Sequence, residues 1–123
     1  MTNEEYDVRN GLRLAQKYAF SQSTKAGWWD GIDVDDKVPE KLCLIHIEVS
    51  EAMEGHRKDL MDDHLPHRQM IEVELADALI RIFDLGAALD LDLGGAVIEK
   101  MDYNRHRLDH KKEHRNSTGG KRY

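Results

Sequence analysis

Two pairs of acidic residues set in apolar helical sequence constrain the fold of this chain more than any other feature. Glu48 and Glu51 form the first pair, and Glu74 and Asp77 form the second. Both pairs have the i, i+3 spacing that places two side chains on one face of a helix. Pro66 lies in the polar stretch between them and marks a turn that would fold the two helices back on each other. Four carboxylates would then face one cleft.

Carboxylates crowded in such a cleft would repel one another unless a divalent cation lay among them. Ligands that are all hard oxygens suit Mg²⁺, with Mn²⁺ as the alternative. Magnesium usually keeps water ligands and takes further oxygens from the phosphates of a substrate. The reaction class that this centre favours is metal-assisted hydrolysis of a phosphoanhydride. One glutamate that does not coordinate the metal directly would take the proton of the attacking water.

The spacing of apolar residues predicts an all-α fold arranged like a four-helix bundle. Apolar residues recur at steps of three and four, and the chain has only two prolines. We expect a single domain over 1–115 and a short basic tail over 116–123. Pro39 would lie in the first turn of the second helix, and residues 90–95 would interrupt the pattern before the fourth. The predicted helices span about 3–21, 39–61, 67–89 and 96–112.

Cysteine usage and the absence of long apolar runs predict a cytoplasmic location. Cys43 is the one cysteine, so no intrachain disulfide can form, which suits a reducing compartment. The first residues are acidic and lack the apolar segment of a secretory signal. No apolar run approaches the roughly 20 residues that a membrane-spanning helix needs. We therefore expect no membrane partner.

The net charge of −6 is unevenly distributed along the chain. From Lys100 onward there are eight Lys/Arg and three Asp/Glu, a net charge of +5, which leaves −11 on the first 99 residues. The basic end could supply cations to a phosphate ligand, or it could grip a polyanion. The second possibility gives the alternative function: a non-catalytic helical interaction module with a structural metal site and a basic tail that binds nucleic acid.

Two further patterns have both a structural and a ligand-binding interpretation. Trp28 and Trp29 are adjacent in a glycine-flanked loop, where they would cover the core or an oligomer interface, or stack on the flat ring of a ligand. Lys100, Asn104 and Arg107 follow one another at i, i+4 and i+7 on one strip of the fourth predicted helix. That strip would face either solvent, as such residues commonly do, or a polar ligand.

Two other kinds of metal site have weaker sequence support. A four-helix di-iron centre needs Glu-x-x-His on two helices, and no glutamate in this chain has a histidine three residues later. His106, His110 and His114 are spaced by four and could form a transition-metal stripe, although a solvated helix face suits them better.

The acid pairs and the residues around them resemble the MazG-like family of all-α nucleoside triphosphate pyrophosphohydrolases. That family has Glu-x-x-Glu, a spacer and then Glu-x-x-Asp, and here twenty-two residues separate Glu51 from Glu74. The flanking segments that resemble the family's motifs and its Lys…Asn…Arg segment are 44–54, 74–85 and 100–107. Residues 25–30 and 120–123 are similar to a small, often phage-associated branch.

The resemblance implies a Mg²⁺-dependent enzyme that converts an NTP or dNTP to the monophosphate and pyrophosphate. It implies that Glu48 and Glu51 are catalytic and that Glu48, Glu51, Glu74 and Asp77 hold the metal. Arg81 would pair with Asp77 or with a phosphate. The residues that the resemblance assigns to the substrate are Lys25, Trp28, Trp29, Arg81, Lys100, Asn104 and Arg107.

The resemblance also implies a homodimer or homotetramer whose sites combine helices of more than one protomer. The broad apolar surface predicted for the helix over 39–61 agrees with such an assembly. Under this interpretation the partner molecules are a nucleoside triphosphate and further copies of the chain, and we do not expect nucleic acid to be one.

Overall fold

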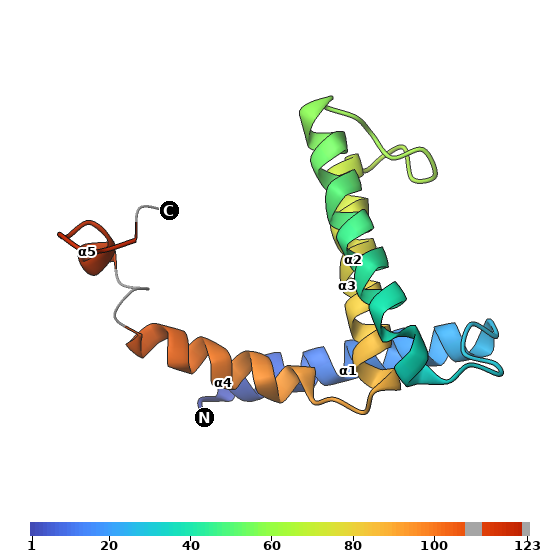
Figure 1. Cartoon of the computed structure of the whole chain (residues 1–123), viewed down its shortest axis with the longest axis horizontal. Coiled ribbons are helices and arrows are strands. Elements are labelled where there is room, and N and C mark those ends of the chain that lie inside the picture. Colours follow the sequence, from blue (N-terminus) through green and yellow to red (C-terminus); the bar gives the residue numbers. More distant parts are fainter. Residues whose placement is uncertain (108–111, 122–123) are drawn as a thin grey trace. The chain divides into compact units, whose positions relative to one another are not determined.

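The structure, a computed structural model, describes residues 1–107 and 112–121, and within them it contains helices and no named strand (Figure 1). The prediction of an all-α fold is therefore confirmed. Among the helices of these residues, none combines the length and apolar character that crossing a membrane requires. The helices are α1 (Asn3–Lys25), α2 (Val34–Arg57), α3 (Met70–Ala88), α4 (Leu93–His106) and the short α5 (Lys112–Arg115).

Residue contacts divide the chain into two compact units. One consists of Met1–Arg13 and Asp92–Tyr123, and the other of Leu14–Leu91. The first part of α1 belongs to the former unit and the rest of α1 to the latter. The single domain over 1–115 stays a prediction. Parts of the predicted fourth helix and of the tail, together with the predicted metal-stripe residue His110, fall in 108–111 and 122–123, which lie outside the described residues.

Helix α1 begins where the sequence predicts and ends about one turn later. Thr2 and Glu5 form a capping box, in which the Glu5 N–H donates to Thr2 Oγ1 at 3.1 Å and the Thr2 N–H donates to Glu5 Oε2 at 2.7 Å. The expected end near residue 21 is wrong. The last turn is held because the Ser23 hydroxyl donates to Asp84 at 3.1 Å, and because the positive charge of Lys25 suits a helix C-terminus.

The expected start of α2 at Pro39 is also wrong, because an aspartate begins the helix earlier. The Asp33 side chain accepts a hydrogen bond from the Asp35 N–H at 3.2 Å, and Asp35 and Asp36 are favourable acids in the first turn. Pro39 therefore lies inside α2, in its second turn, where the missing N–H costs the helix one hydrogen bond to a carbonyl of the first turn.

Helices α2 and α3 pack against each other as an antiparallel hairpin (Figure 1). The buried apolar residues of the described chain are Ala52 on α2 and Ala78 and Leu85 on α3. Gly55 is also buried, and it faces Met70 at the start of α3. Small residues at the contact allow the two helix backbones to approach closely.

The loop over 58–69 confirms a turn around Pro66 but delays the start of α3 from the expected residue 67 to Met70. The Asp62 carboxylate is buried and accepts hydrogen bonds from the N–H groups of His64 and Leu65 at 3.0 and 2.8 Å. The Asp62 N–H donates to the carbonyl of Arg68 at 2.9 Å. These bonds close the loop on itself and occupy backbone groups that an earlier helix would need.

In the unit formed by Met1–Arg13 and Asp92–Tyr123, α4 begins at Leu93, so the expected break over 90–95 is too long. The Asp92 carboxylate accepts from the Gly95 N–H at 3.0 Å and from two nitrogens of Arg13 at 2.9 and 2.6 Å. The Arg13 bonds first, and then the Gly95 bond, lower the pKa of Asp92 to about 2. This cap starts the helix in spite of two glycines in its first turn.

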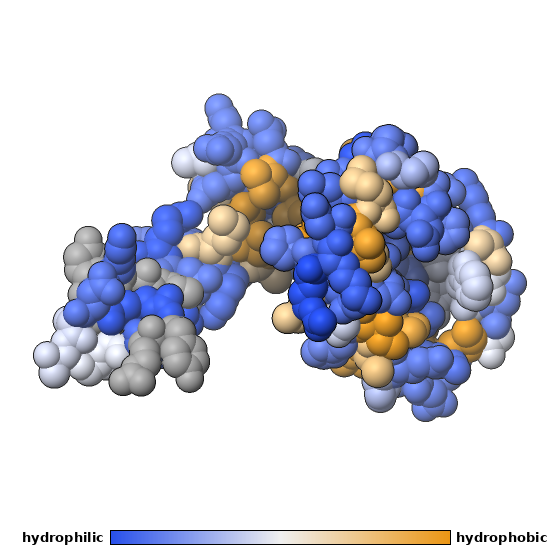
Figure 2. Space-filling model, turned by 90° about the horizontal axis from the view of Figure 1, so that it is seen from above, coloured by the Kyte–Doolittle hydropathy of each residue, from blue (hydrophilic) through white to orange (hydrophobic). Residues whose placement is uncertain are grey.

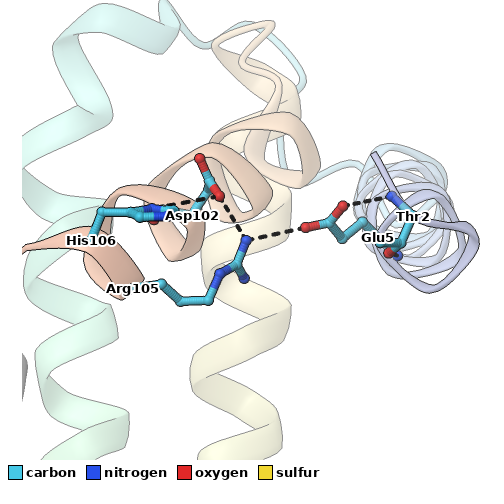
Figure 3. A network of polar contacts seen from close by, with 5 residues as sticks. All are labelled: Thr2, Glu5, Asp102, Arg105 and His106. Atoms are coloured by element: carbon cyan, nitrogen blue, oxygen red, sulfur yellow. Dashed lines mark hydrogen bonds and ion pairs between the residues drawn. The ribbon is translucent and has the colours of Figure 1, made fainter.

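The far end of α4 carries a small network of polar contacts (Figure 3). Arg105 Nη2 lies 2.7 Å from Asp102 Oδ1 and 3.3 Å from Glu5 Oε1, so it connects α4 to the capping box of α1. His106 Nδ1 lies 2.9 Å from the carbonyl oxygen of Asp102. The helix ends at His106, with Arg107 in an extended conformation at φ −75° and ψ 127°, and the part of the predicted helix over 108–111 lies outside the described residues.

Large apolar side chains remain exposed on several helices, and Figure 2 shows orange apolar surface between polar residues. On α2 and α3 a single chain buries little more than the contact between the two helices. The exposed apolar residues of these two helices are Leu42, Ile47, Val49, Met53, Leu75, Leu79, Ile80 and Ile82.

The close approach at Gly55 gives a test of the hairpin packing. A Cβ at Gly55 would lie 2.7 Å from Met70 Cγ and 2.8 Å from Met70 Cβ, so Gly55→Ala forces the helices apart. Overpacking of this kind outweighs the gain in helix propensity of about 1 kcal/mol, and we expect a net loss of about 1 kcal/mol in the free energy of unfolding. Urea denaturation measures it.

Gly11 supplies the matched control, because nothing lies within 4 Å of a Cβ placed there. Gly11→Ala should stabilise the chain by up to about 1 kcal/mol. In a Met70→Ala background, which removes Cγ and Sδ but keeps Cβ, Gly55→Ala should destabilise less than it does in the parent. Equal destabilisation in both backgrounds would show that Met70 is not the obstacle.

Candidate metal centre

Three of the four acids in the predicted pairs come together between α2 and α3. Glu48 on α2 and Glu74 and Asp77 on α3 each offer one carboxylate oxygen, and these oxygens lie within 4.8 Å of one another. We call these three residues the acid cluster. Among the described residues it is the one group of three or more His, Cys, Asp or Glu side chains close enough to share an ion. The i, i+3 spacing and the turn between the helices were sufficient signals for it.

Glu51, the fourth predicted metal ligand, lies outside this group of three. It is exposed on α2, one turn after Glu48. Its carboxyl group still acts on Glu74, because Glu51 is among the neighbours that raise the pKa of Glu74. Glu51 therefore borders the acid cluster from its solvent side.

Burial makes the acid cluster retain a proton. Burial first, and then the neighbouring carboxyl groups of Glu48 and Glu51, raise the pKa of Glu74 to about 8. Burial and the charge of Glu48 also raise the pKa of Asp77, while the charge of Arg81 opposes that rise. At neutral pH the cluster thus carries fewer negative charges than it has carboxyl groups.

Arg81 compensates part of the remaining charge. Its Nε lies 2.8 Å from Glu48 Oε1, and the Glu48 side chain is only 10 % exposed. The sequence predicted a pairing of Arg81 with Asp77 or with a phosphate. The ion pair is with Glu48 on the facing helix and not with Asp77, while a contact between Arg81 and a phosphate stays a prediction.

Asp62 is an acidic residue near the cluster that sequence reasoning read only as part of a turn. It is 7 % exposed, and its charge contributes to raising the pKa of Asp77. The signal that could have found it is the local pattern in which an aspartate accepts hydrogen bonds from backbone N–H groups two and three residues later.

The acid cluster fits a hard divalent cation. All of its donors are carboxylate oxygens, which Mg²⁺ and Mn²⁺ favour. Glu74 Oε2 is buried and has no hydrogen-bond partner within the described part of the chain. A buried acceptor without a partner is unfavourable, and a cation in the cluster would satisfy it.

The structure separates the roles of the two tryptophans. Trp29 is half-buried, its ring packs at 6.4 Å from that of Phe20, and its indole N–H donates to Asp84 at 3.0 Å. Trp28 is 67 % exposed. Lys25, also assigned to substrate by the resemblance, is the exposed last residue of α1. Covering the core therefore describes Trp29, whereas for Trp28 a role at an oligomer interface and a role in ligand binding both stay predictions.

The predicted phosphate-binding strip belongs to the unit of Met1–Arg13 and Asp92–Tyr123. Lys100 Nζ and the Arg107 guanidinium lie 4.6 and 5.9 Å from the ring centroid of Tyr103, so the two cations share one side of α4. Asn104 Oδ1 is buried without a hydrogen-bond partner among the described residues. A contact between this strip and phosphate stays a prediction.

Comparisons of the chain with protein-family models, with curated proteins and with solved structures gave no match in any of the three.

The proton of the acid cluster makes the stability of the metal-free chain depend on pH. The pKa of Glu74 is about 8 in the folded chain, against an ordinary value of 4.5. The folded state therefore binds this proton more tightly than the unfolded state, and the free energy of unfolding should fall as the pH rises between these values. Thermal unfolding in EDTA across this range measures the effect.

Glu74→Gln should remove most of this dependence, because an amide does not titrate in the range. Added Mg²⁺ should raise the melting temperature of the parent most at the alkaline end, where the cation no longer competes with the proton. If the variant loses stability with pH as steeply as the parent, Glu74 is not the group responsible.

Proposed function

We propose that the protein is a Mg²⁺-dependent nucleoside triphosphate pyrophosphohydrolase of the MazG-like type, with Mn²⁺ as an alternative cation. The observation that carries the proposal is the acid cluster, whose three carboxylate oxygens lie within 4.8 Å of one another with one buried oxygen of Glu74 unpartnered. Such all-oxygen sites suit cations that also bind the phosphates of a substrate. The resemblance of the acid motifs and their flanks to that family supports the choice of substrate.

In this proposal Glu48, Glu74 and Asp77 hold the metal, and Glu51 is the neighbouring acid that does not coordinate it directly. When bound, the cation polarises phosphate oxygens and neutralises charge that develops on them. Glu51 is the candidate general base, because it is exposed and lies outside the three ligand oxygens that come together. Its carboxylate can take a proton from a water without leaving the helix face that it shares with Glu48.

The proposed reaction breaks the bond between the α-phosphorus and the oxygen that bridges it to the β-phosphorus. The oxygen of a water molecule forms a bond to the α-phosphorus, and the proton of that water goes to a carboxylate oxygen of Glu51. Pyrophosphate leaves with the bridging oxygen and both electrons of the broken bond. The products are the nucleoside monophosphate and pyrophosphate.

Positively charged side chains would bind the phosphates. The Nε–H of Arg81 donates to Glu48 and keeps this metal ligand in place. The terminal nitrogens of Arg81 make no hydrogen bond within the described residues, so they can reach an anion. Lys25, Lys100, Asn104 and Arg107 keep the substrate-binding roles that the resemblance gives them.

We further propose that the protein is a homodimer or homotetramer. Leu42, Val49 and Met53 on α2 and Leu75 and Leu79 on α3 are all exposed in the single chain. Burial of apolar surface is worth about 25 cal/mol per Å², so a second copy that covers these residues would stabilise both chains.

An assay of pyrophosphate release with Mg²⁺ across the common ribo- and deoxyribonucleoside triphosphates tests the enzyme. Glu51→Gln should lower kcat about 100-fold or more, as expected for the loss of a general base. Glu72→Gln is the matched control, since Glu72 is an exposed acid on α3 whose ion pair is with Arg68. Circular dichroism confirms that each variant is folded.

Two results would overturn the proposal: no pyrophosphate from any nucleotide with the parent protein, or equal rates for Glu51→Gln and the parent. Sedimentation velocity of the same preparation checks the assembly. A monomer at assay concentration would contradict the oligomer while leaving the proposed reaction in place.

A further inference from the structure

The loop that joins α1 to α2 is fastened to α3 by one carboxylate. We call residues 26–33 the tryptophan loop. Asp84 on α3 accepts from the Trp29 indole N–H through Oδ1 at 3.0 Å, and from the Ser23 hydroxyl through Oδ2 at 3.1 Å. One oxygen therefore binds the loop and the other binds the last turn of α1 just before it.

A second contact fastens the same indole to α2. Lys41 Nζ lies 4.9 Å from the ring centroid of Trp29, a distance suited to a cation–π interaction. Phe20 of α1 packs against the same ring in a tilted arrangement. Trp29 is thus held by side chains of three helices.

Lys41 and Asp84, which hold Trp29, are each separated from an acid of the cluster by the same number of residues. Lys41 precedes Glu48 by seven residues on α2, and Asp84 follows Asp77 by seven on α3. Seven residues are close to two turns of helix, so each residue shares a face with the acid on its own helix, about 10 Å along the axis. Because α2 and α3 are antiparallel, the step from Glu48 back to Lys41 and the step from Asp77 forward to Asp84 lead toward the same end of the hairpin. The tryptophan loop is therefore fixed on the face of the hairpin that carries the acids. On both helices its contact residue lies about two turns from an acid of the cluster.

Trp28 is the neighbour of this fixed indole. It is 67 % exposed, whereas its backbone is held: its N–H donates to the carbonyl of Ser23 at 3.2 Å. Gly27, immediately before it, has φ of +84°, a conformation that glycine adopts readily and other residues rarely do. The loop thus presents an exposed aromatic ring at a defined place instead of on a loose segment.

We propose that Asp84 and Lys41 are positioning residues that hold the tryptophan loop through Trp29, so that Trp28 stacks on the base of a nucleotide whose phosphates lie at the acid cluster. This inference rests on the proposed function. Stacking on an indole does not depend on base identity, so the contact adds affinity for a nucleoside without selecting one base.

Binding measurements separate the base from the phosphates. The probes are an α,β-methylene nucleoside triphosphate, which resists the proposed cleavage, and inorganic tripolyphosphate, which has no base, both titrated by calorimetry with Mg²⁺ present. Trp28→Ala and Asp84→Leu should weaken nucleotide binding about 10-fold or more. Both variants should bind tripolyphosphate as the parent does.

Two conservative variants are the controls. Trp28→Phe keeps an aromatic face, and Asp84→Asn keeps an acceptor for the indole and a group that can bond to Ser23, so both should bind the nucleotide within a few-fold of the parent. Trp28 is exposed, so Trp28→Ala leaves the fold intact even if Asp84→Leu does not.

The outcomes distinguish this inference from the proposed reaction. Loss of nucleotide affinity in Trp28→Ala and Asp84→Leu, with tripolyphosphate affinity kept, supports the inference even if the parent releases no pyrophosphate. Unchanged nucleotide affinity in both variants overturns it and leaves the reaction standing. Equal loss for both probes also overturns it, because the loop would then act on the acid cluster and not on the base. A parent that binds neither probe overturns both.

Discussion

The compensation of buried negative charge between α2 and α3 is the constraint on which the rest of the structure depends. Glu48, Glu74 and Asp77 approach within 4.8 Å inside the contact of the two helices. They can remain there because Glu74 keeps a proton and Arg81 pairs with Glu48. The hairpin therefore needs a positive charge or a proton at its centre to stay closed. A divalent cation could provide the same compensation, so the same carboxyl groups would serve both the packing of the hairpin and the proposed chemistry.

Features that depend on nearby residues could be predicted from the sequence. The 3–4 spacing of apolar residues gave the all-α fold, and the i, i+3 acids with a turn between them brought Glu48, Glu74 and Asp77 together. Helix boundaries were less accurate. Pro39 and the glycines near residue 94 suggested later starts for α2 and α4, whereas Asp33 and Asp92 cap these helices earlier. A capping side chain outweighed the residues that usually disfavour a helix, and for Asp92 its strength depends on Arg13, which is distant in the sequence.

Side-chain partners across helices could not be predicted in the same way. Arg81 binds a residue 33 positions earlier and Asp84 one 55 positions earlier. Each of these partners depends on the register of packed elements. A shift of one residue in that register would bring different side chains together. Trp29 and Trp28 are chemically identical and adjacent, yet only the first is enclosed. Trp28 is 67 % exposed, and nothing in the residue type distinguishes it from Trp29.

The small number of buried apolar residues has a consequence for how folding of this chain is controlled. With Ala52, Ala78 and Leu85 as its buried apolar residues in the described part, a single chain has little hydrophobic driving force of its own. If further copies cover the apolar faces of α2 and α3, folding and association become one equilibrium, and protein concentration acts as a stabilising ligand. The amount of the protein in its surroundings would then determine how much of it is folded.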